Sequence, residues 1–390
     1  MTRAWRFALE HYATLPLGAV IAIVWANGHP VSYFQAAQAL AFAVNDIGMA
    51  LVLAYLAQEV IEAALPGGGL HPWRRGIVPV IAGAGGSLGA IAVYAAYVHS
   101  GDEEVLARGW PIASAVDVVF CLAVARSIFR RSVAVTFLLL LAIASDVVGL
   151  TVISRHRLIA DAHPAAAFLI VAAIVASVVL RQSGVRSVWP YLCLSGPLAW
   201  LGCYWAGMHP ALALLPIVPF LPRSERDLDG IARPERGVHR TASHFESVFE
   251  YPVQGVAFLF GLVNAGVLLR GFGTGTWAVL TASIAGRPVG ILAAVGLAVA
   301  AGLPLPRHIS WRELVVVALA ASPCVGFGLF FAAAVFPDGP LLIETRMGAI
   351  STAAGVLLAL AAARLLRVGR FADLAAPPQG VRAEMTKERA

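Results

Sequence analysis

Charge is scarce in this 390-residue chain, in which 13% of the residues are Asp, Glu, Lys or Arg. That is about half of the share typical of a soluble domain. Lysine is almost absent, since Lys387 is the only one. With 59% hydrophobic residues and a mean hydropathy of +0.80, the composition predicts a polytopic membrane protein. The formal charge of +6 comes from arginine spread over short loops, so no nucleic-acid partner is predicted.

Cysteine is also rare, which argues against a disulfide framework. The four cysteines lie inside apolar runs and are predicted to be small core residues: Cys121, Cys193, Cys203 and Cys324. The first 26 residues lack a convincing cleavage site, and their apolar part predicts a first membrane helix rather than a removable leader. Neither a nucleophile–base pair nor a metal-ligand spacing is visible, so neither enzymatic activity nor a cofactor is expected.

Long apolar runs are the main feature of the sequence. A hydrocarbon core of about 30 Å requires about 20 apolar residues per helix. On this rule we predict about twelve spans, at 13–27, 42–64, 76–98, 111–127, 132–154, 165–181, 188–203, 205–221, 248–269, 275–302, 310–336 and 345–367. The expected fold is an all-α polytopic membrane protein, with one transmembrane domain at 1–370 and a poorly ordered cytoplasmic tail at 371–390.

Arginine is distributed unevenly over the predicted loops. An even number of spans puts both termini on one side, together with the arginine-rich loops, among them 222–246. The acidic loop 102–104 then falls on the other side. The positive-inside rule therefore predicts that both termini are cytoplasmic.

Two predicted spans contain helix-breaking residues. The first, 111–127, holds Pro111, Ser114 and Asp117, and the second, 313–336, holds a proline and two glycines within 322–328. One break alone is equally well explained as a tolerated kink. Irregular backbone at membrane depth persists only beside protein or a water-lined cavity, and paired breaks in two halves of a transporter indicate its binding site.

Three ionisable residues interrupt apolar spans: Asp117, Asp146 and Arg287. A charge at bilayer depth costs at least about 2.5–3.5 kcal/mol, so such a group usually faces a partner or a water-filled path. Three of them, of both signs, indicate a transporter rather than a membrane anchor. Acidic residues also lie at 46, near a predicted helix start, and at 59 and 62.

Asp146 is the predicted carrier. Burial disfavours the charged form of a carboxylate, so this group can hold a proton or release it and accept a small cation. Ser145 adds a neutral oxygen, and a purely structural aspartate is the alternative. Asp117 and Arg287 are candidate counter-charges, because half-helix ends carry about +0.5 and −0.5 charges. Asp117 is equally a candidate second carrier.

Glu59 and Glu62 are three residues apart, which puts both on one face of a helix near its cytoplasmic end. They are candidates for a cation funnel or a pH-responsive mouth. An ordinary solvated helix end explains the pair equally well.

Five segments, in chain order, resemble the NhaA-type sodium/proton antiporters: 45–50 with Glu59, 109–120, 142–149, 264–267 and 286–290. The resemblance covers nearly the whole chain. It implies twelve helices with two inverted repeats and two crossed discontinuous helices, in the bacterial inner membrane. It also implies a secondary transporter that exchanges Na⁺ or Li⁺ for H⁺ in pH homeostasis.

The resemblance further implies a role for each matching position. Asp146 matches the ion-binding aspartate and Asp117 the aspartate at the helix crossing. Arg287 matches a lysine of the family. Glu59 matches an acid at the cytoplasmic funnel, and the basic residues that usually follow it are replaced by the segment 60–64, which contains Glu62.

Two departures from the family pattern bear on mechanism. Ser145 replaces the first of two paired aspartates, and Arg287 replaces the lysine. Serine does not titrate and arginine is not deprotonated in proteins, so Asp146 is the one obvious proton carrier left. We therefore hypothesise an exchange near one to one, without net charge movement.

Other interpretations remain open. The chain could be a carrier of another solute on the same fold, such as an organic anion bound by Arg287, or a non-transporting sensor. The stretch between Asn27 and Asp46 is too short for the periplasmic hairpin that takes part in the family's dimer contact. A homodimer therefore stays an alternative, and the shortness of this stretch argues against it.

Overall fold

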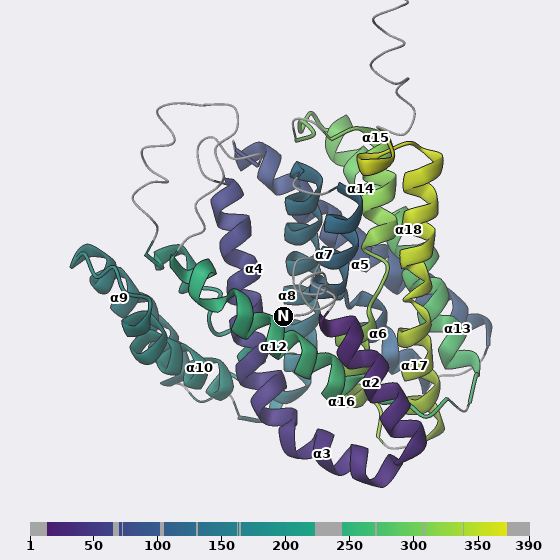
Figure 1. Ribbon diagram of the computed structural model, residues 1–390, viewed down its shortest axis with the longest axis horizontal. Coiled ribbons are helices and arrows are strands. Elements are labelled where there is room, and N and C mark those ends of the chain that lie inside the picture. The colour runs from purple at the N-terminus through teal and green to yellow at the C-terminus, as the bar shows by residue number, and fades with distance from the viewer. Residues whose placement is uncertain are drawn as a thin grey trace, which may run out of the picture.

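The computed structural model is a bundle of helices (Figure 1). It describes residues 14–64, 70–71, 73–101, 105–129, 132–161, 163, 165–222, 244–269, 271–306, 309–337 and 339–372. The predictions for the loops 102–104 and 223–243, and for the tail from 373 onward, lie outside these residues. Across the described ranges all regular structure is helical, which confirms the predicted all-α class.

The N-terminal half contains the first broken helix. It comprises α2 (Thr14–Gly28), α3 (Pro30–Phe42), the π-helical turn η1 (Ala43–Gly48), α4 (Met49–Ala64), α5 (Trp73–Ser100), α6 (Trp110–Ser114), α7 (Val118–Phe129), α8 (Val133–Asp161), α9 (Ala165–Gln182), the π-helical turn η3 (Tyr191–Ser195) and α10 (Gly196–Trp205). The helices α9 and α10 pack on each other and lie at the left of Figure 1.

The C-terminal half contains the second broken helix. It comprises α12 (His244–Asn264), α13 (Thr274–Thr281), the π-helical turn η7 (Ala282–Gly286), α14 (Arg287–Ala300), α15 (Trp311–Ala320), α16 (Val325–Val335), α17 (Pro340–Ser351) and α18 (Ala354–Leu365). In each half the broken helix lies between two long helical segments, so the halves share one plan.

Both predicted breaks are present. The segment Leu106–Ser114 meets α7 at a bend of 43°, and α15 meets α16 at a bend of 47°. The non-helical residues are 115–117 in the first break and 322–324 in the second. Asp117 N–H donates to Pro323 O at 3.0 Å, so the two breaks touch each other. The crossed discontinuous helices that the resemblance implied are therefore part of this fold.

Six of the described helices are long and apolar enough to cross a membrane, or up to eight if each bent pair is one span. The predicted span 205–221 was wrong as a helix, because its residues form turns with short 3₁₀ segments at Pro210–Leu212 and Val218–Phe220. Pro210, Pro216 and Pro219 explain the difference, since proline lacks an N–H and disfavours helix at the residue before it.

The second predicted span, 42–64, was placed to begin too late. A continuous helical segment already starts at Pro30 and runs to Glu62. Asp46 therefore lies inside a long helix rather than near a helix start, and Trp200 Nε1 donates to its carbonyl at 3.2 Å. Helix α3, the front end of this segment, occupies the stretch that is too short for a hairpin.

Tyr33 fixes α3 to the end of α12. Its hydroxyl donates to Leu262 O at 2.9 Å and accepts from Gly266 N–H at 2.9 Å. A Cβ atom on Gly266 would meet the Tyr33 ring, so a glycine is required at this close approach. The first helices are thereby tied to α12.

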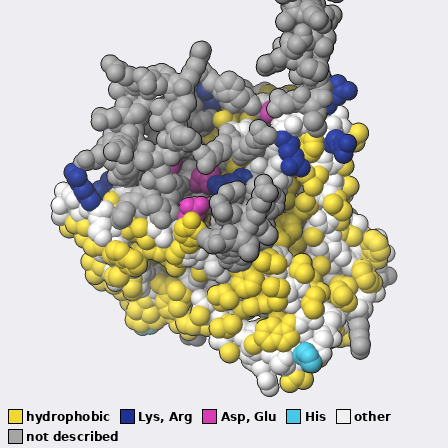
Figure 2. Space-filling view, in the orientation of Figure 1, with side chains coloured by type: hydrophobic (Ala, Val, Ile, Leu, Met, Phe, Trp, Pro, Cys, Tyr) yellow, Lys and Arg dark blue, Asp and Glu magenta, His cyan; other side chains and the backbone are white. Residues whose placement is uncertain are grey.

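The outer surface of the bundle is apolar. Figure 2 shows hydrophobic side chains over much of the described surface, with the arginines visible on this face lying in its upper half. Phe168 of α9, Leu297 of α14 and Leu365 of α18 are each at least 72% exposed. Such a surface is stable against lipid tails rather than water. All four cysteines are free, and Cys193 is exposed rather than a core residue.

The backbones of α5 and α14 approach each other closely. A Cβ atom on Gly290 would lie 2.2 Å from Gly85 O, and one on Gly89 would lie 2.5 Å from Gly286 O. Small residues four apart let membrane helices approach closely. This contact sets the position of Arg287, which lies between Gly286 and Gly290 in the sequence.

Candidate functional site

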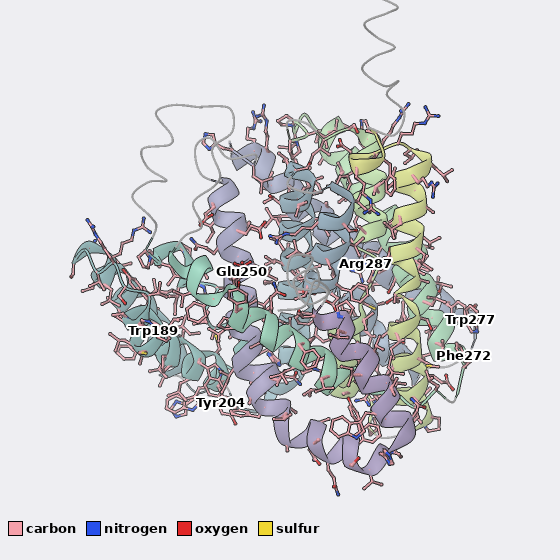
Figure 3. All side chains as sticks on the ribbon, in the orientation of Figure 1. Trp189, Tyr204, Glu250, Phe272, Trp277 and Arg287 are labelled. Atoms are coloured by element: carbon pink, nitrogen blue, oxygen red, sulfur yellow. The ribbon has the colours of Figure 1, made fainter. Side chains whose placement is uncertain are left out.

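Three of the predicted site residues gather at one place, the break at 115–117. Asp117 lies within it, Asp146 reaches it from α8, and Arg287 reaches it from α14. All three are at most 1% exposed. Figure 3 shows Arg287 among the helices, whereas Phe272 and Trp277 lie at the periphery of the bundle.

Asp117 is bonded to the N-terminal ends of two half-helices. Its Oδ1 accepts from Phe120 N–H at 2.9 Å in the first turn of α7. Its Oδ2 accepts from Gly326 N–H at 2.7 Å in the first turn of α16. A carboxylate satisfies unpaired amides at a helix start and offsets the partial positive charge there. Both oxygens of Asp117 are therefore occupied.

Arg287 is bonded to the C-terminal end of α6. Its Nη1 donates to Ser114 O at 3.3 Å, and its Nη2 donates to Ala113 O at 2.6 Å and to Ala115 O. The guanidinium thus covers the carbonyls that a helix end leaves unpaired. Its Nε has no acceptor among the described residues. Helix-end carbonyls are one of the compensations that a buried arginine requires.

Asp146 keeps one oxygen unused. Its Oδ1 accepts from Val116 N–H at 3.1 Å. No donor in the described part of the chain reaches its Oδ2, although that atom is fully buried. A buried carboxylate oxygen without a donor is costly and marks a place where a proton or cation can bind.

Ser145 is next to Asp146 in sequence but is bonded elsewhere. Its hydroxyl lies at 3.1 Å from Gly83 O on α5 and at 3.0 Å from Leu141 O one turn earlier on α8. A hydroxyl has one proton to donate and keeps its oxygen lone pairs. Ser145 therefore joins α8 to α5.

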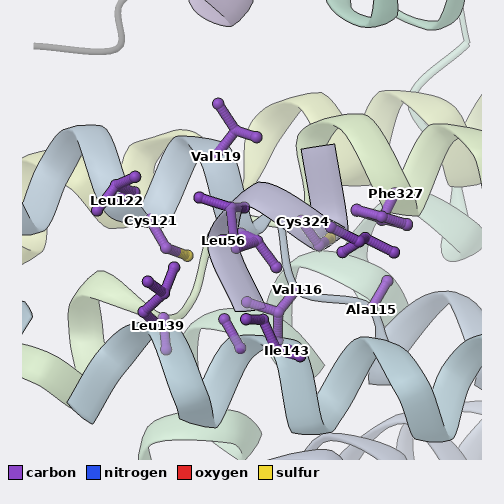
Figure 4. Packing of buried hydrophobic residues seen from close by; sticks show 14 of the residues in the cluster. Leu56, Ala115, Val116, Val119, Cys121, Leu122, Leu139, Ile143, Cys324 and Phe327 are labelled. Atoms are coloured by element: carbon purple, nitrogen blue, oxygen red, sulfur yellow. The ribbon is translucent and has the colours of Figure 1, made fainter. Parts of the chain in front are cut away.

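The surroundings of these groups are apolar. Figure 4 shows Val116 together with Leu56 of α4, Ile143 of α8 and Cys324 from the second break. Each of these side chains is at most 7% exposed. Electrostatic interactions are strong in such a low-dielectric environment.

Glu59 and Glu62 lie away from the break, at the end of α4. Glu59 forms an ion pair with Arg126 of α7, with Nη2 at 3.1 Å from Oε2. Glu62 accepts from Gln58 Nε2 at 3.1 Å. Sequence reasoning noted the missing basic residues after Glu59 but not the ion pair with Arg126, which is 67 residues away. The only available signal was a charged residue near the end of an apolar span.

His209 is a second contact that the sequence did not reveal. Its Nε2 lies 4.0 Å from Oδ1 of Asp46. The histidine comes from the turn segment that was expected to be a helix, so its position was not predictable. The Asp46 side chain is 24% exposed, and this contact lies outside the group at the break.

A buried acid and a buried arginine at the crossing of two broken helices define a membrane transporter of the discontinuous-helix class. Residues 11–368 match the family model described as Na+/H+ antiporter 1. The chain belongs to this family.

Individual relatives agree with this family. The Na(+)/H(+) antiporter NhaA of Desulfitobacterium hafniense is 37% identical over 94% of this chain and 97% of its own length. The Na(+)/H(+) antiporter NhaA of Geobacter metallireducens is 36% identical over 93% and 97%. The solved sodium proton antiporter of Methanocaldococcus jannaschii is 14% identical, with a TM-score of 0.55 over 90% of this chain and 92% of that one. The last likeness concerns the fold.

Proposed function

We propose that this protein is a secondary transporter that exchanges Na⁺ or Li⁺ for H⁺ across the bacterial inner membrane. The carrying observation is Oδ2 of Asp146, a fully buried carboxylate oxygen that no donor among the described residues reaches. A proton or a small cation can occupy this oxygen, and the two compete because both need the same lone pairs. Alternating occupancy at one carboxylate couples their fluxes in opposite directions. We propose no enzymatic role.

The cation also needs neutral oxygens. Ser145 is next to Asp146 in the sequence, and its Oγ keeps lone pairs after donating its proton. Oxygen ligands suit hard cations, so Ser145 is our second proposed ligand.

Asp117 is better suited to a counter-charge than to a carrier. Each of its oxygens already accepts from the first turn of a half-helix. Taking up a proton or a cation would weaken two hydrogen bonds that hold the crossing together. Arg287 provides the opposite counter-charge at the end of α6.

The test is cation-driven dissipation of a pH gradient in proteoliposomes. Na⁺ and Li⁺ are expected to collapse the gradient with the wild-type protein, and K⁺ to have a weaker effect. Asp146→Asn is expected to abolish the response, because an amide cannot exchange a proton. Glu250→Gln, which changes an exposed acid of α12, serves as the matched control. Full-rate exchange by Asp146→Asn would overturn the proposal.

We further propose that exchange is one to one and moves no net charge. The supporting observation is that Ser145 and Arg287 cannot carry protons at working pH, which leaves Asp146 alone. Rates should therefore not change when a K⁺ diffusion potential is imposed on the vesicles. Ser145→Asp adds a second carboxylate and is expected to make the rate voltage-dependent. Strong voltage dependence of the wild type would refute this stoichiometry.

An organic anion bound by Arg287 is the competing function. Three of the five guanidinium N–H donors are already bonded to carbonyls of one helix end, which leaves Nε as the only guanidinium nitrogen of Arg287 without a described acceptor. This geometry favours the cation reading. Labelled-anion counterflow with Arg287 intact would distinguish the two, because only an anion carrier gives a signal. A fold that only senses would give neither flux.

For topology, we propose that both termini are cytoplasmic, in line with the arginine distribution. A cysteine at position 387, in a variant without the four native cysteines, should react with an impermeant maleimide in inverted vesicles. Reaction only in right-side-out vesicles would reverse the proposed orientation.

We also propose that α3 does not support a hairpin-mediated homodimer, so the detergent-solubilised protein should have the mass of a monomer in light scattering. A stable dimer would contradict this.

A further inference from the structure

We propose that the Ala115–Val116 peptide unit links Arg287 to Asp146. Through it, Arg287 acts as a positioning residue that sets the pH range in which Asp146 exchanges its proton for a cation. This inference rests on the proposed function of Asp146. It concerns how the two buried charges communicate without a direct ion pair.

The geometry is specific to one peptide unit. Its carbonyl, on Ala115, accepts from Nη2 of Arg287, and its N–H, on Val116, donates to Oδ1 of Asp146 at 3.1 Å. A trans peptide points these two groups in opposite directions. The arginine and the aspartate therefore lie on opposite sides of one planar group.

The neighbouring peptide units do not make this connection. Ala115 N–H donates to Ile112 O at 3.3 Å within α6, and Asp117 N–H donates to Pro323 O at 3.0 Å in the second break. Ala115 has φ −64° and ψ 140°, so the helix has already ended there. The break thus frees the 115–116 peptide unit from helical hydrogen bonding, and both of its polar groups meet charged side chains.

The link has an electrical consequence. A charge-assisted hydrogen bond to a carbonyl polarises the peptide, and hydrogen bonds in a chain strengthen one another by about 10–30% each. Arg287 therefore makes Val116 N–H a stronger donor. A stronger donor favours the ionised form of Asp146, which is the form that admits a cation.

Other titratable groups also face this site. They are Asp117 and Cys121 from the first broken helix, and Cys324 from the second break. The helices α4, α5 and α15 also pack against α8. Their acidic, histidine and arginine residues lie toward helix ends, and their buried tyrosines are Tyr55 and Tyr94. The hydrogen bonds of the 115–116 peptide go to Arg287 and Asp146, so each of these other groups should contribute a background that the variants below leave in place.

The experiment measures Na⁺-induced thermal stabilisation of the purified full-length protein in detergent over a range of pH. Binding to the folded state raises the melting temperature, so this readout needs no transport. The measured quantity is the pH at which half of the Na⁺-induced shift is reached. Replacing Val116 by its α-hydroxy acid analogue removes the N–H and keeps every side chain. Arg287→Lys keeps the charge but loses the planar fork that reaches several carbonyls.

Both changes should move this midpoint to higher pH, by about one pH unit, which is roughly a tenfold change in proton affinity. In the hydroxy acid background, Arg287→Lys should add no further shift, because the link is already broken. The matched control is the hydroxy acid analogue at Ala115. That neighbouring peptide also contacts Arg287, through Ser114 O, but its N–H goes to Ile112 O. Arg181→Lys, at an exposed arginine that donates to Pro219 O, controls for the side-chain change itself.

Two outcomes would overturn the inference. One is an unchanged midpoint after hydroxy acid replacement at 116. The other is an Arg287→Lys shift that adds fully to it, which would mean that the charge acts through space. If Arg287→Lys fails to fold, the two hydroxy acid variants decide the question alone. Absence of any Na⁺-induced stabilisation in the wild type would instead count against Asp146 as the cation site.

Discussion

The charges at the helix crossing and the charges at the end of α4 are stabilised in different ways. At the crossing, Asp117 accepts from two backbone amides and Arg287 donates to three backbone carbonyls. At the end of α4, Glu59 is stabilised by the side chain of Arg126, and both are partly exposed at 15% and 28%. One region uses the polar ends of half-helices, and the other uses a partner of opposite charge.

The difference follows from what each region has to leave free. An arginine paired directly with Asp146 would occupy the oxygen that a cation or proton needs. Backbone amides and carbonyls are fixed in place and carry only partial charges, so they hold Asp117 and Arg287 without engaging Oδ2 of Asp146. Near water, a side-chain pair costs little to form or open. The broken helices thus allow the buried helix crossing to hold Asp117 and Arg287 without a direct ion pair between charged side chains.

The largest expected effect tests the backbone-held arginine. Arg287→Ala leaves three buried carbonyls of the α6 end without a donor, and unmet buried groups cost about 1–3 kcal/mol each. We expect a loss of about 2–4 kcal/mol, because removing a buried charge recovers part of its desolvation cost. Melting in detergent measures it, beside Arg181→Ala, an exposed arginine that also donates to a carbonyl. Equal melting temperatures for Arg287→Ala and the wild type would rule out the counter-charge role of Arg287.

An intermediate loss of stability is expected at the α5–α14 contact, where the position of Arg287 depends on close packing. Gly290→Ala would place a Cβ atom 2.2 Å from Gly85 O, so α14 must move away from α5 and take Arg287 with it. Overpacking of this kind costs about 1–3 kcal/mol. Gly296→Ala on the same helix meets nothing within 4 Å and is the matched control. Its melting should be unchanged or slightly raised, and a similar loss in both variants would show that packing at Gly290 is not special.

Much of the buried helix crossing was predictable from the sequence. Proline and glycine at 111 and 322–328 marked the breaks, and Asp117, Asp146 and Arg287 stood out because charges are rare in apolar spans. Their partners were not predictable, because they are backbone groups that every residue has. Which carbonyl meets Arg287 is decided by the α5–α14 contact, not by a local pattern.

The errors have a common physical origin. Span 205–221 was judged by hydropathy, which averages over its three prolines, so an apolar segment of turns looked like a helix. Asp46 was expected near a helix start because the predicted span began at residue 42, whereas a π-helical turn carries it inside a continuous helix. The Arg126–Glu59 pair joins residues on different helices, and no periodicity in one helix indicates its partner on another.

The smallest expected effect concerns this pair. Partly exposed ion pairs contribute about 0–1 kcal/mol, and added salt screens them. In a double-mutant cycle with Glu59→Gln and Arg126→Gln, we therefore expect a coupling free energy below about 1 kcal/mol that falls as NaCl is replaced by a higher concentration of choline chloride. The same salt series should leave the melting difference between Arg287→Ala and the wild type unchanged, because no mobile ion screens the buried helix end. A coupling of several kcal/mol at high salt would mean that the Glu59–Arg126 pair is as well shielded from water as the buried helix crossing. The contrast between the two regions would then be lost.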